Sequence, residues 1–468
     1  MERKRIYLCL AHMSDEGWEQ KYIKEAFDTN WVVPLGPNVN GFEKDLEQFI
    51  IHNAPLGDIR RRLPKQECII TPEMKEKRVV ALSAGTAAVH LSLLACGVGP
   101  GDEVLVQSFT FCASSHPITY LGATPVFVDS EKETWNMDPD LLEEAIKDRI
   151  AKTGKKPKAI VPVALYGMPY KIDRIMKIAN KYEIPVVEDA AEGFGSKFKG
   201  QVLGTFGKYG VLSFNGNKMI TTSGGGALIT PDEDSWREIM MYATQYRESY
   251  PYYQHEKIGY NYRMSNICAG IGRGQMTVVN DHIAHHKHVQ ALYEGLLKDV
   301  PGVHVHSQPD VRWKMADGRE VPVYDSNYWL CTITIDENVK VKGQEDAYKT
   351  IVTCAVGGAA GVIHIADSAT TDCQPNDNVE ALRVYLDQAQ VEARPVWKPM
   401  HKQPVYTRGK MSEVRCQNYT CQISESSVAY VNGVSEAIFK VGMCLPAGPY
   451  VSDEDVRYIV ECIKEAIE

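Results

Sequence analysis

The chain has 468 residues, of which 44% are hydrophobic and 24% are charged, and its formal net charge is −9. This composition excludes a disordered chain, a collagen-like repeat and a small disulfide-stabilised scaffold. The mild acidity gives no basis for nucleic-acid binding, which requires a basic surface. At roughly 150 residues per domain, the length predicts about three units, or one large fold with a smaller satellite.

Helices are expected at 19–27 and 42–51, ahead of a polar, proline-containing stretch at 52–77. From Arg78 onward, strand-like apolar runs alternate with helical stretches. The predicted strands are 103–107, 125–128, 158–163 and 184–187, and the predicted helices are 86–97, 112–121, 138–150 and 171–182. This alternation predicts an α/β fold, in which a mixed, mostly parallel sheet carries helices on both faces.

The alternation fades after about residue 235. One long helix is expected from Tyr262 to Val300, followed by mixed strands and helices. A terminal amphipathic helix follows Ser452, which is a suitable N-cap. The expected organisation is an N-terminal segment (1–40) packed on the small domain and the active site, a large domain (41–285) and a smaller α+β domain (286–468).

No membrane segment or disulfide framework is visible in the sequence. The start of the chain lacks a signal-peptide pattern, and the nearest membrane candidate, Thr350 to Ala366, is shorter than the roughly 20 residues a membrane helix needs. We expect a buried strand or helix there. The 12 cysteines are scattered, without a Cys-x-x-Cys pair, so reduced thiols in a cytoplasmic protein are expected.

Ligands of open α/β sheets bind at the carboxyl ends of the strands, so the residues that follow each strand are candidates for a site. Ser83-Ala84-Gly85-Thr86 follows the first strand and opens a helix. The free N–H groups and the dipole of such a helix suit a phosphate, although the same residues also form ordinary caps. Phe111 follows the next strand, where core packing is the alternative.

Two further strand ends carry residues whose side chains suit a role in catalysis. Asp189 ends a buried strand, where an acid is costly without a partner such as a cationic ring nitrogen or a metal. Lys218 lies between two strand-like runs beside a glycine turn, where a lysine can become a nucleophilic amine. A lysine, an acid, a phosphate cradle and a planar group together fit pyridoxal phosphate.

The run from Val186 to Leu228, which contains both Asp189 and Lys218, resembles the DegT/DnrJ-type nucleotide-sugar aminotransferases. This family has the aspartate aminotransferase-like fold, fold type I of the pyridoxal phosphate enzymes. The resemblance extends over most of the chain, through the opening TNWVVPLGPNVNGFEKDL and the segments 83–129, 259–272 and 394–406.

The resemblance implies a role for each matching residue. Lys218 forms the Schiff base with the cofactor and moves a proton, Asp189 pairs with the ring nitrogen, and Phe111 stacks on the ring. The other implied cofactor contacts are Gly85, Thr86, Ser213 and Asn261, of which Asn261 reaches the phosphate from the other subunit of a homodimer with shared active sites. Glu192 occupies a position where many members have His or Gln.

The segment that carries Trp397, Lys398 and His401 resembles the sugar-nucleotide side of the family's site. Related sugar dehydratases have His at the position of Lys218, so the lysine favours amino transfer. The variants around Asp189 and Lys218 are most similar to members that aminate C4 of a UDP-4-keto-6-deoxy-N-acetylhexosamine in bacillosamine-type pathways. GDP- and dTDP-linked sugars are the alternatives. The implied amino donor is glutamate, with ping-pong kinetics and a role in surface polysaccharide or glycan biosynthesis.

Three other interpretations were weighed. A cofactor-bound regulatory protein of the same family, with little turnover, remains an alternative. A dinucleotide site at Gly193, Gly195 and Gly200 is not favoured, because these glycines are displaced from their strand. The histidines of DHIAHHKH (281–288) are expected on a solvated helix face rather than around a metal, and no metal site is expected. Since family members are shorter, we expect insertions at 52–77, 340–376 and 407–427, of which the last two lie in the C-terminal domain.

Overall fold

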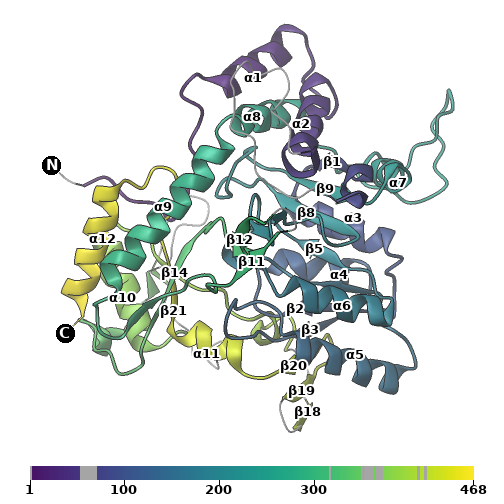
Figure 1. The fold of residues 1–468 in the computed structure, drawn as a ribbon. Coiled ribbons are helices and arrows are strands. Elements are labelled where there is room, and N and C mark those ends of the chain that lie inside the picture. Colours follow the sequence, from purple (N-terminus) through teal and green to yellow (C-terminus); the bar gives the residue numbers. More distant parts are fainter. Residues whose placement is uncertain are drawn as a thin grey trace.

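The computed structural model describes residues 3–52, 71–315, 318–348, 351–352, 362–363, 373–407, 412–415 and 419–467. Two layers of helices enclose a central group of strands, and a second group of helices and strands packs beside it (Figure 1). The expected α/β class, with helices on both faces of a mixed sheet, is confirmed. The predicted strands and helices between 78 and 190 all occur, with ends that differ by a few residues.

The central strands form two hydrogen-bonded groups. The first has the order β1 (Arg78–Leu82), β9 (Gly226–Thr230), β8 (Tyr209–Ser213) and β5 (Val187–Asp189), in which β9 runs antiparallel to both of its neighbours. The second contains β3 (Thr124–Val128), β2 (Glu103–Gln107) and β4 (Ala159–Val161), all parallel. Parallel bridges from Ile160 to Val186 and from Val163 to Asp189 join the two groups.

Alternate residues of each strand enter different cores, because successive side chains point to opposite faces of a sheet. Val79 and Ala81 pack with α2 (Pro37–Glu47), and the same core includes residues of α5 (Pro139–Thr153) and α6 (Ile172–Tyr182). Val80 and Leu82 pack in the other core with α3 (Gly85–Ala95), α4 (His116–Tyr120) and α7 (Glu233–Ala243).

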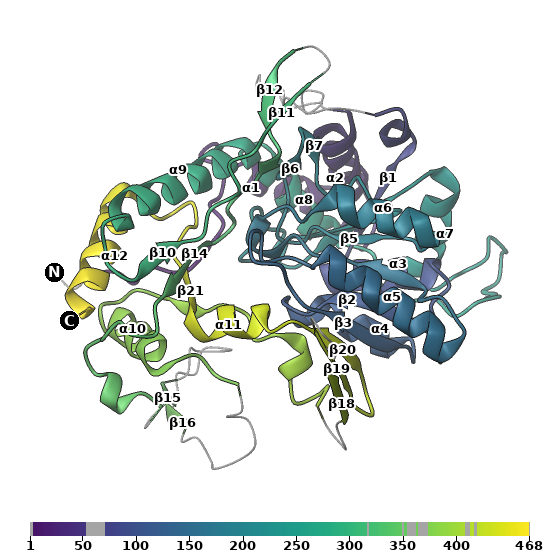
Figure 2. The same ribbon diagram turned by 60° about the horizontal axis from the view of Figure 1, so that its bottom comes forward.

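Three strands from the C-terminal part of the chain extend the second group. They are β18 (Ser412–Arg415), β19 (Thr420–Ile423) and β20 (Val428–Val431), which form an antiparallel meander. β20 pairs in parallel with β3, so the yellow strands in Figure 2 lie beside the blue ones. Much of the expected insertion 407–427 therefore joins the sheet built by the first half of the chain.

The N-terminal helices lie against the glycine-rich helix α8 (Asn266–Met276). α1 (Trp18–Asp28) and α2 pack on it, and α2 continues into a π-helical turn, Gln48–His52. A Cβ atom at Gly274 would lie 2.6 Å from the backbone nitrogen of Glu19. Only glycine therefore permits this close approach of α1 to α8.

The expectation of one long helix from Tyr262 to Val300 is wrong. α8 begins after Ser265, whose side chain caps the amide of Ile267, and α9 (Val279–Leu297) begins only after a break at Thr277 and Val278. The Thr277 hydroxyl donates to the carbonyl of Gly274, and this local hydrogen bond competes with the helical ladder.

A third core lies under α9, α10 (Asp377–Gln388) and α12 (Asp453–Ala466). These helices pack on an antiparallel sheet in the order β10 (Val303–Val305), β14 (Cys331–Ile335), β21 (Gly442–Leu445) and β17 (Arg394–Pro395). α11 (Val434–Val441) leads directly into β21. The expected cap of α12 is confirmed, because Ser452 and Asp455 form a capping box.

Short strand pairs complete the described chain: β6 (Lys197–Phe198) with β7 (Gln201–Val202) and β13 (Tyr324–Asp325), β11 (Arg312–Lys314) with β12 (Glu320–Pro322), and β15 (Ile351–Val352) with β16 (Val362–Ile363). Within the described ranges, no helix has both the length and the apolar character that a membrane crossing needs. The stretch Thr350 to Ala366 lies mostly outside the described residues, as does most of 52–77.

Candidate active site

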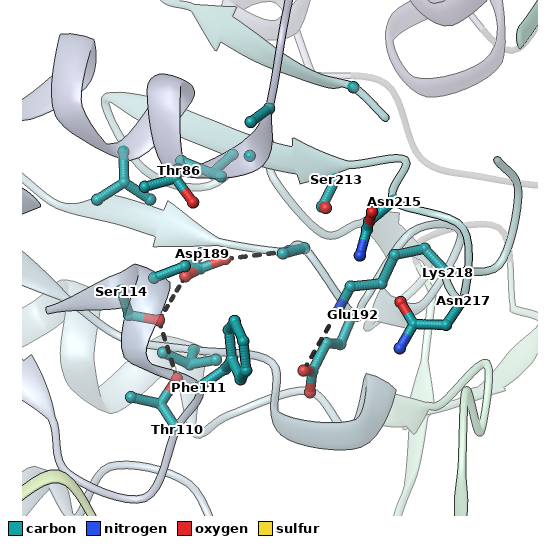
Figure 3. A pocket seen from close by; sticks show the side chains of 18 of the residues that line it. Thr86, Thr110, Phe111, Ser114, Asp189, Glu192, Ser213, Asn215, Asn217 and Lys218 are labelled. Atoms are coloured by element: carbon teal, nitrogen blue, oxygen red, sulfur yellow. Dashed lines mark hydrogen bonds and ion pairs between the residues drawn. The ribbon is translucent and has the colours of Figure 1, made fainter. Parts of the chain in front are cut away.

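A cavity of about 370 Å³ lies at the carboxyl ends of β5 and β8. This is the position at which an open α/β sheet binds its ligands. The cavity brings together eight of the residues expected in the site: Gly85, Thr86, Phe111, Asp189, Glu192, Ser213, Lys218 and Trp397. Figure 3 shows that they come from several loops and strand ends that surround one space.

Asp189 ends β5, and its carboxylate faces the cavity. Oδ2 accepts a hydrogen bond of 2.6 Å from the Ser114 hydroxyl, and Oδ1 accepts one of 3.1 Å from the amide of Ala191 (Figure 3). Burial raises the pKa of Asp189, while the Ser114 hydrogen bond and the charge of Lys218 oppose that shift. Among the described residues, the hydrogen-bond donors to this carboxylate are neutral, and such a buried carboxylate suits a cationic ring nitrogen as its partner.

The N-terminus of α3 forms one end of the cavity. Its N-cap residue, Ala84, has no capping side chain, so the first amide groups of the helix are available to an anion. A Cβ atom at Gly85 would lie 2.9 Å from Cβ of Ser213. Glycine at this position therefore lets α3 approach the end of β8, where the Ser213 and Thr86 side chains also line the cavity.

Lys218 enters the cavity from the loop between β8 and β9. Its Nζ lies 3.3 Å from Oε1 of Glu192 and 3.9 Å from the centroid of the Trp329 ring. The Lys218 side chain is 13% exposed and that of Glu192 is 4% exposed. The amine is thus held inside the protein and points toward the residues that follow β5 (Figure 3).

Glu192 has a second anchor in Tyr166. The backbone amide of Tyr166 donates to Oε2 of Glu192 over 2.7 Å, although Tyr166 has the positive φ of 53° that is rare for this residue type. Burial raises the pKa of Glu192, and Lys218 and the Tyr166 amide lower it. The unfavourable backbone conformation of Tyr166 fixes the direction of the carboxylate.

Aromatic rings form the wall of the cavity between Lys218 and Phe111. The rings of Trp329 and Tyr166 are stacked, with centroids 6.5 Å apart, and Trp397 lies 5.8 Å from Tyr166 and 5.6 Å from Phe111. Phe111 is 51% exposed, so one side of its ring is free. A second cavity of about 410 Å³ continues past Phe111 and Trp397 and is lined by Lys398.

Two expected site residues lie outside both cavities. His401 is buried, with Nδ1 2.6 Å from the Ser108 hydroxyl and Nε2 3.1 Å from Glu436, so both ring nitrogens are engaged. Asn261 is exposed, although the carbonyl of its neighbour Tyr262 accepts a hydrogen bond from the amide of Ser83 at the cavity.

The histidine cluster differs from expectation. His282 and His286 are buried, because α9 packs against the loops around Lys218 and Trp329. Nδ1 of His282 lies 3.0 Å from the carbonyl of Met219, and Nδ1 of His286 lies 3.1 Å from that of Tyr328. Among the described residues, no group of three His, Cys, Asp or Glu side chains could hold a metal ion.

Sequence reasoning missed Ser114, Tyr166, Asn217 and Trp329, all of which contact site residues or line the cavity. Ser114 and Asn217 lie within the expected strand-end loops and could have been included on that basis. Trp329 lies more than a hundred positions from Lys218, and no local pattern of the sequence pairs them.

Comparison with known proteins identifies the family. Residues 70–347 match the model of the DegT/DnrJ/EryC1/StrS aminotransferase family. The chain belongs to this family. It is 36% identical over 463 residues to the Bacillus subtilis (strain 168) protein named "Putative pyridoxal phosphate-dependent aminotransferase EpsN", with 98% of this chain and 95% of the relative covered.

Two further likenesses extend over almost the whole chain. The chain is 30% identical over 460 residues to a GDP-perosamine synthase of Escherichia coli O157:H7, with 98% of each chain covered. The crystal structure of a DegT DnrJ EryC1 StrS aminotransferase from Brucella abortus superposes with a TM-score of 0.71 at 24% identity, covering 96% of this chain and 95% of the other.

Family membership confirms the expected enzyme class, an aminotransferase, and the expected cofactor, pyridoxal phosphate. The cavity fits this group. Lys218 supplies an amine, Asp189 a buried carboxylate for the ring nitrogen, and Gly85 a cradle that a side chain would fill. In addition, the buried Oδ1 of Asn217 has no hydrogen-bond partner among the described residues, and so is available to a ligand.

Proposed function

We propose that this protein transfers the amino group of glutamate to the 4-keto carbon of a nucleotide-linked 4-keto-6-deoxy sugar. The reaction serves the biosynthesis of a surface polysaccharide or glycan in the cytoplasm. The observation that carries the proposal is that Lys218, Asp189 and the N-terminus of α3 face a single cavity, which continues into a second cavity large enough for the rest of a substrate.

Each residue has a separate task in this reaction. Pyridoxal phosphate, when bound, supplies an electron sink that makes the hydrogen on the donor's α-carbon acidic. Lys218 Nζ accepts that proton in the first half of the reaction, and in the second half it delivers a proton to the sugar carbon. Asp189 keeps the ring nitrogen protonated, and the amides of α3 with the hydroxyls of Thr86 and Ser213 hold the phosphate.

The sugar nucleotide would occupy the second cavity. Lys398 is the cation there, and Trp397 lies between the two cavities. An ammonium group beside an aromatic surface suits a diphosphate next to a hexose. His401, with both nitrogens engaged by Ser108 and Glu436, would act here by holding the segment that carries Trp397 and Lys398.

The nucleotide is expected to be uridine diphosphate. This expectation rests on the Asp-Ala-Ala-Glu sequence at 189–192 and on the SFNGNK sequence that ends at Lys218. The name of the Escherichia coli relative supports guanosine diphosphate as the alternative. Direct comparison of UDP-, GDP- and dTDP-linked 4-keto-6-deoxy sugars as acceptors tests this point.

We also infer a homodimer with shared active sites. Asn261 is exposed in a surface segment that carries further exposed apolar side chains, among them Tyr252, Tyr253 and Ile258. Contact with a second copy of the chain would bury these side chains and could bring Asn261 to the phosphate of the partner's cofactor. Light scattering of the purified protein measures the assembly.

The experiment that tests the function uses the visible absorption of the protein loaded with pyridoxal phosphate. Glutamate should bleach the visible band and release 2-oxoglutarate, and a 4-keto sugar nucleotide should restore the band and yield an amino sugar. Lys218→Ala should abolish the band without a loss of melting temperature. A regulatory protein with little turnover would bind the cofactor but release no 2-oxoglutarate with any acceptor.

A further inference from the structure

The environment of the Lys218 amine contains more than the residues that define the family's site. Nζ lies over the face of Trp329, 3.9 Å from the ring centroid, and 3.3 Å from Oε1 of Glu192. A π-face and a carboxylate both attract an ammonium group, and they do so more strongly where water is excluded. Trp329 is 1% exposed.

Two hydrogen bonds fix Trp329, one from its indole ring and one from its backbone amide. Its indole Nε1 donates to the carbonyl of Asn217, over 2.6 Å, and its amide donates to Oδ1 of Asn327 over 2.9 Å. Trp329 therefore binds the backbone immediately before Lys218 with its edge and the Lys218 amine with its face. A ring tied to the same loop that it contacts cannot drift away from the lysine.

Asn327 connects Trp329 to Glu192. Its Nδ2 donates to the carbonyls of Glu192 and Phe194, at 2.9 Å and 3.0 Å. The buried Asn327 side chain thus sets the distance between the Trp329 ring and the Glu192 carboxylate. α9 adds a second support, because the carbonyls of Met219 and Tyr328, next to Lys218 and Trp329, accept hydrogen bonds from His282 and His286. Burial lowers the pKa of both histidines, so that they are neutral and can donate one N–H each.

We propose that the Trp329 ring and the Glu192 carboxylate form a site that holds the Lys218 side chain in position when Nζ is not bonded to the cofactor. Trp329 and Glu192 are then positioning residues, which act on substrate through the lysine. The catalytic meaning of the site rests on the proposed function, since amino transfer requires the lysine to be released and to return in each cycle. The contacts themselves belong to the polypeptide alone.

The charges around the lysine are consistent with this assignment. The titratable groups that interact with Lys218 are Glu192 and Asp189 on the segment that ends β5, and Cys9 on the N-terminal segment. Burial raises the pKa of the Cys9 thiol to about 12, so it carries no charge near neutral pH. Asp189 accepts its hydrogen bonds from Ser114 and Ala191, which leaves Glu192 as the carboxylate in direct contact with the amine.

The test measures how readily Lys218 reacts in the full-length protein freed of cofactor. Trinitrobenzenesulfonate reacts only with a neutral amine, and peptide mass spectrometry reports its attachment at each lysine. Glu192→Gln keeps the shape of the side chain and removes its charge. We expect it to raise the labelling rate of Lys218 by about tenfold, because the amine loses the attraction of the carboxylate and is free to meet the reagent. Trp329→Leu should raise the rate about three- to tenfold, whereas Trp329→Phe, which keeps a π-face, should stay within about threefold of the wild type.

Two controls separate the proposed site from a change in access or folding. Trp397→Leu opens the same cavity without removing a contact to Lys218, and should leave the labelling of Lys218 within about twofold of wild type. Lys298, an exposed lysine, is the internal standard within each sample. If Trp329→Leu does not fold, Glu192→Gln and Trp329→Phe still decide the question.

The proposal is overturned if Glu192→Gln and Trp329→Leu label Lys218 no faster than Trp397→Leu does. This result is independent of the proposed function, which is tested by bleaching of the visible band with glutamate. If glutamate bleaches the visible band normally but the variants show no change in Lys218 labelling, the proposed function stands and the proposed site for Lys218 is rejected. A protein that binds no cofactor loses the function, and the labelling still reports on the site.

Discussion

The Ser114 hydroxyl donates a hydrogen bond to Oδ2 of Asp189 over 2.6 Å, and the same hydroxyl lies 2.8 Å from that of Thr110. This contact joins the loop after β2 to the end of β5. It is one of the interactions that lower the pKa of Asp189, whereas burial raises that pKa. The Ser114 hydroxyl therefore favours the ionised form of Asp189, although Ser114 has no other role in the proposed reaction.

Ser114→Ala should move the acid limit of cofactor binding to higher pH. The hydrogen bond lowers the pKa of Asp189, so its removal lets burial raise that pKa further, and the carboxylate is lost at a higher pH as acid is added. We expect the whole binding curve to be displaced toward higher pH. Equilibrium dialysis of pyridoxal phosphate across pH measures it. Ser115→Ala, one residue later and without a contact to Asp189, should give the wild-type curve.

Asp189→Asn should lower the catalytic rate without lowering the thermal stability of the protein. The amide has no charge to bury, so the protein without cofactor should melt at the wild-type temperature or above it. With cofactor bound, the ring nitrogen loses its anionic partner, and kcat should fall by about a hundredfold or more. Calorimetry and steady-state kinetics on the same preparation compare the two effects. A variant with wild-type kcat would show that Asp189 does not pair with the ring.

Gly85→Ala should weaken phosphate binding through a purely steric effect. The added methyl group would lie 2.9 Å from Cβ of Ser213, so α3 must move away from β8 and take its free amides with it. We expect the Kd of pyridoxal phosphate to rise by about tenfold or more. Gly99→Ala is the matched control, since a Cβ atom there meets nothing within 4 Å. Equal Kd values for the two variants would contradict the proposed cradle.

Subunit mixing should reveal the shared site. Lys218→Ala and Asn261→Ala should each be defective alone. If Asn261 serves the partner subunit, a heterodimer of the two variants has one site with both changes and one intact site. Random reassortment should then restore about a quarter of wild-type activity. No recovery after mixing, with heterodimers demonstrated by mass spectrometry, would place Asn261 in its own subunit's site.

The raised pKa of Glu188 predicts a pH dependence of folding stability that does not involve the candidate active site. Burial raises the pKa of Glu188 to about 7, against an unfolded value of 4.5, so the native state holds a proton that the unfolded state has released. The free energy of unfolding should therefore fall as pH rises from 4.5 to 7, by about 3 kcal/mol in total. Glu188→Gln should remove this loss, whereas Glu183→Gln, at a residue whose side chain is 83% exposed, should not. Denaturant melts at pH 5 and pH 8 measure the difference.

The sequence indicated those parts of the site that follow consecutive strands. Asp189 ends β5 and Ser213 ends β8. Gly85 follows shortly after β1, and Lys218 follows shortly after β8. The rule that strand ends meet at one edge of a sheet was therefore sufficient to place these four residues together. The helix α6 also followed from periodicity, because its buried residues Ile172, Ile175, Ile178 and Ala179 recur at helical spacing.

Other parts depend on contacts between distant segments. Trp329 contacts Lys218 from the loop before β14. His401 is buried where its two ring nitrogens contact Ser108 and Glu436. The buried histidines of α9 were expected on a solvated face, since their sequence does not reveal that two backbone carbonyls lie opposite them. The break between α8 and α9 lies at Thr277 and Val278, where the Thr277 hydroxyl donates to the carbonyl of Gly274, and the sequence pattern did not reveal this local hydrogen bond.

The pairing of β20 with β3 has a consequence for the order in which the molecule can assemble. Three of the six strands in that sheet lie beyond residue 411, nearly three hundred positions after their neighbours. During synthesis, the edge of β3 stays unpaired until β20 has left the ribosome. An open edge of this kind invites pairing with other chains, so chaperone protection matters most in the interval before β20 emerges.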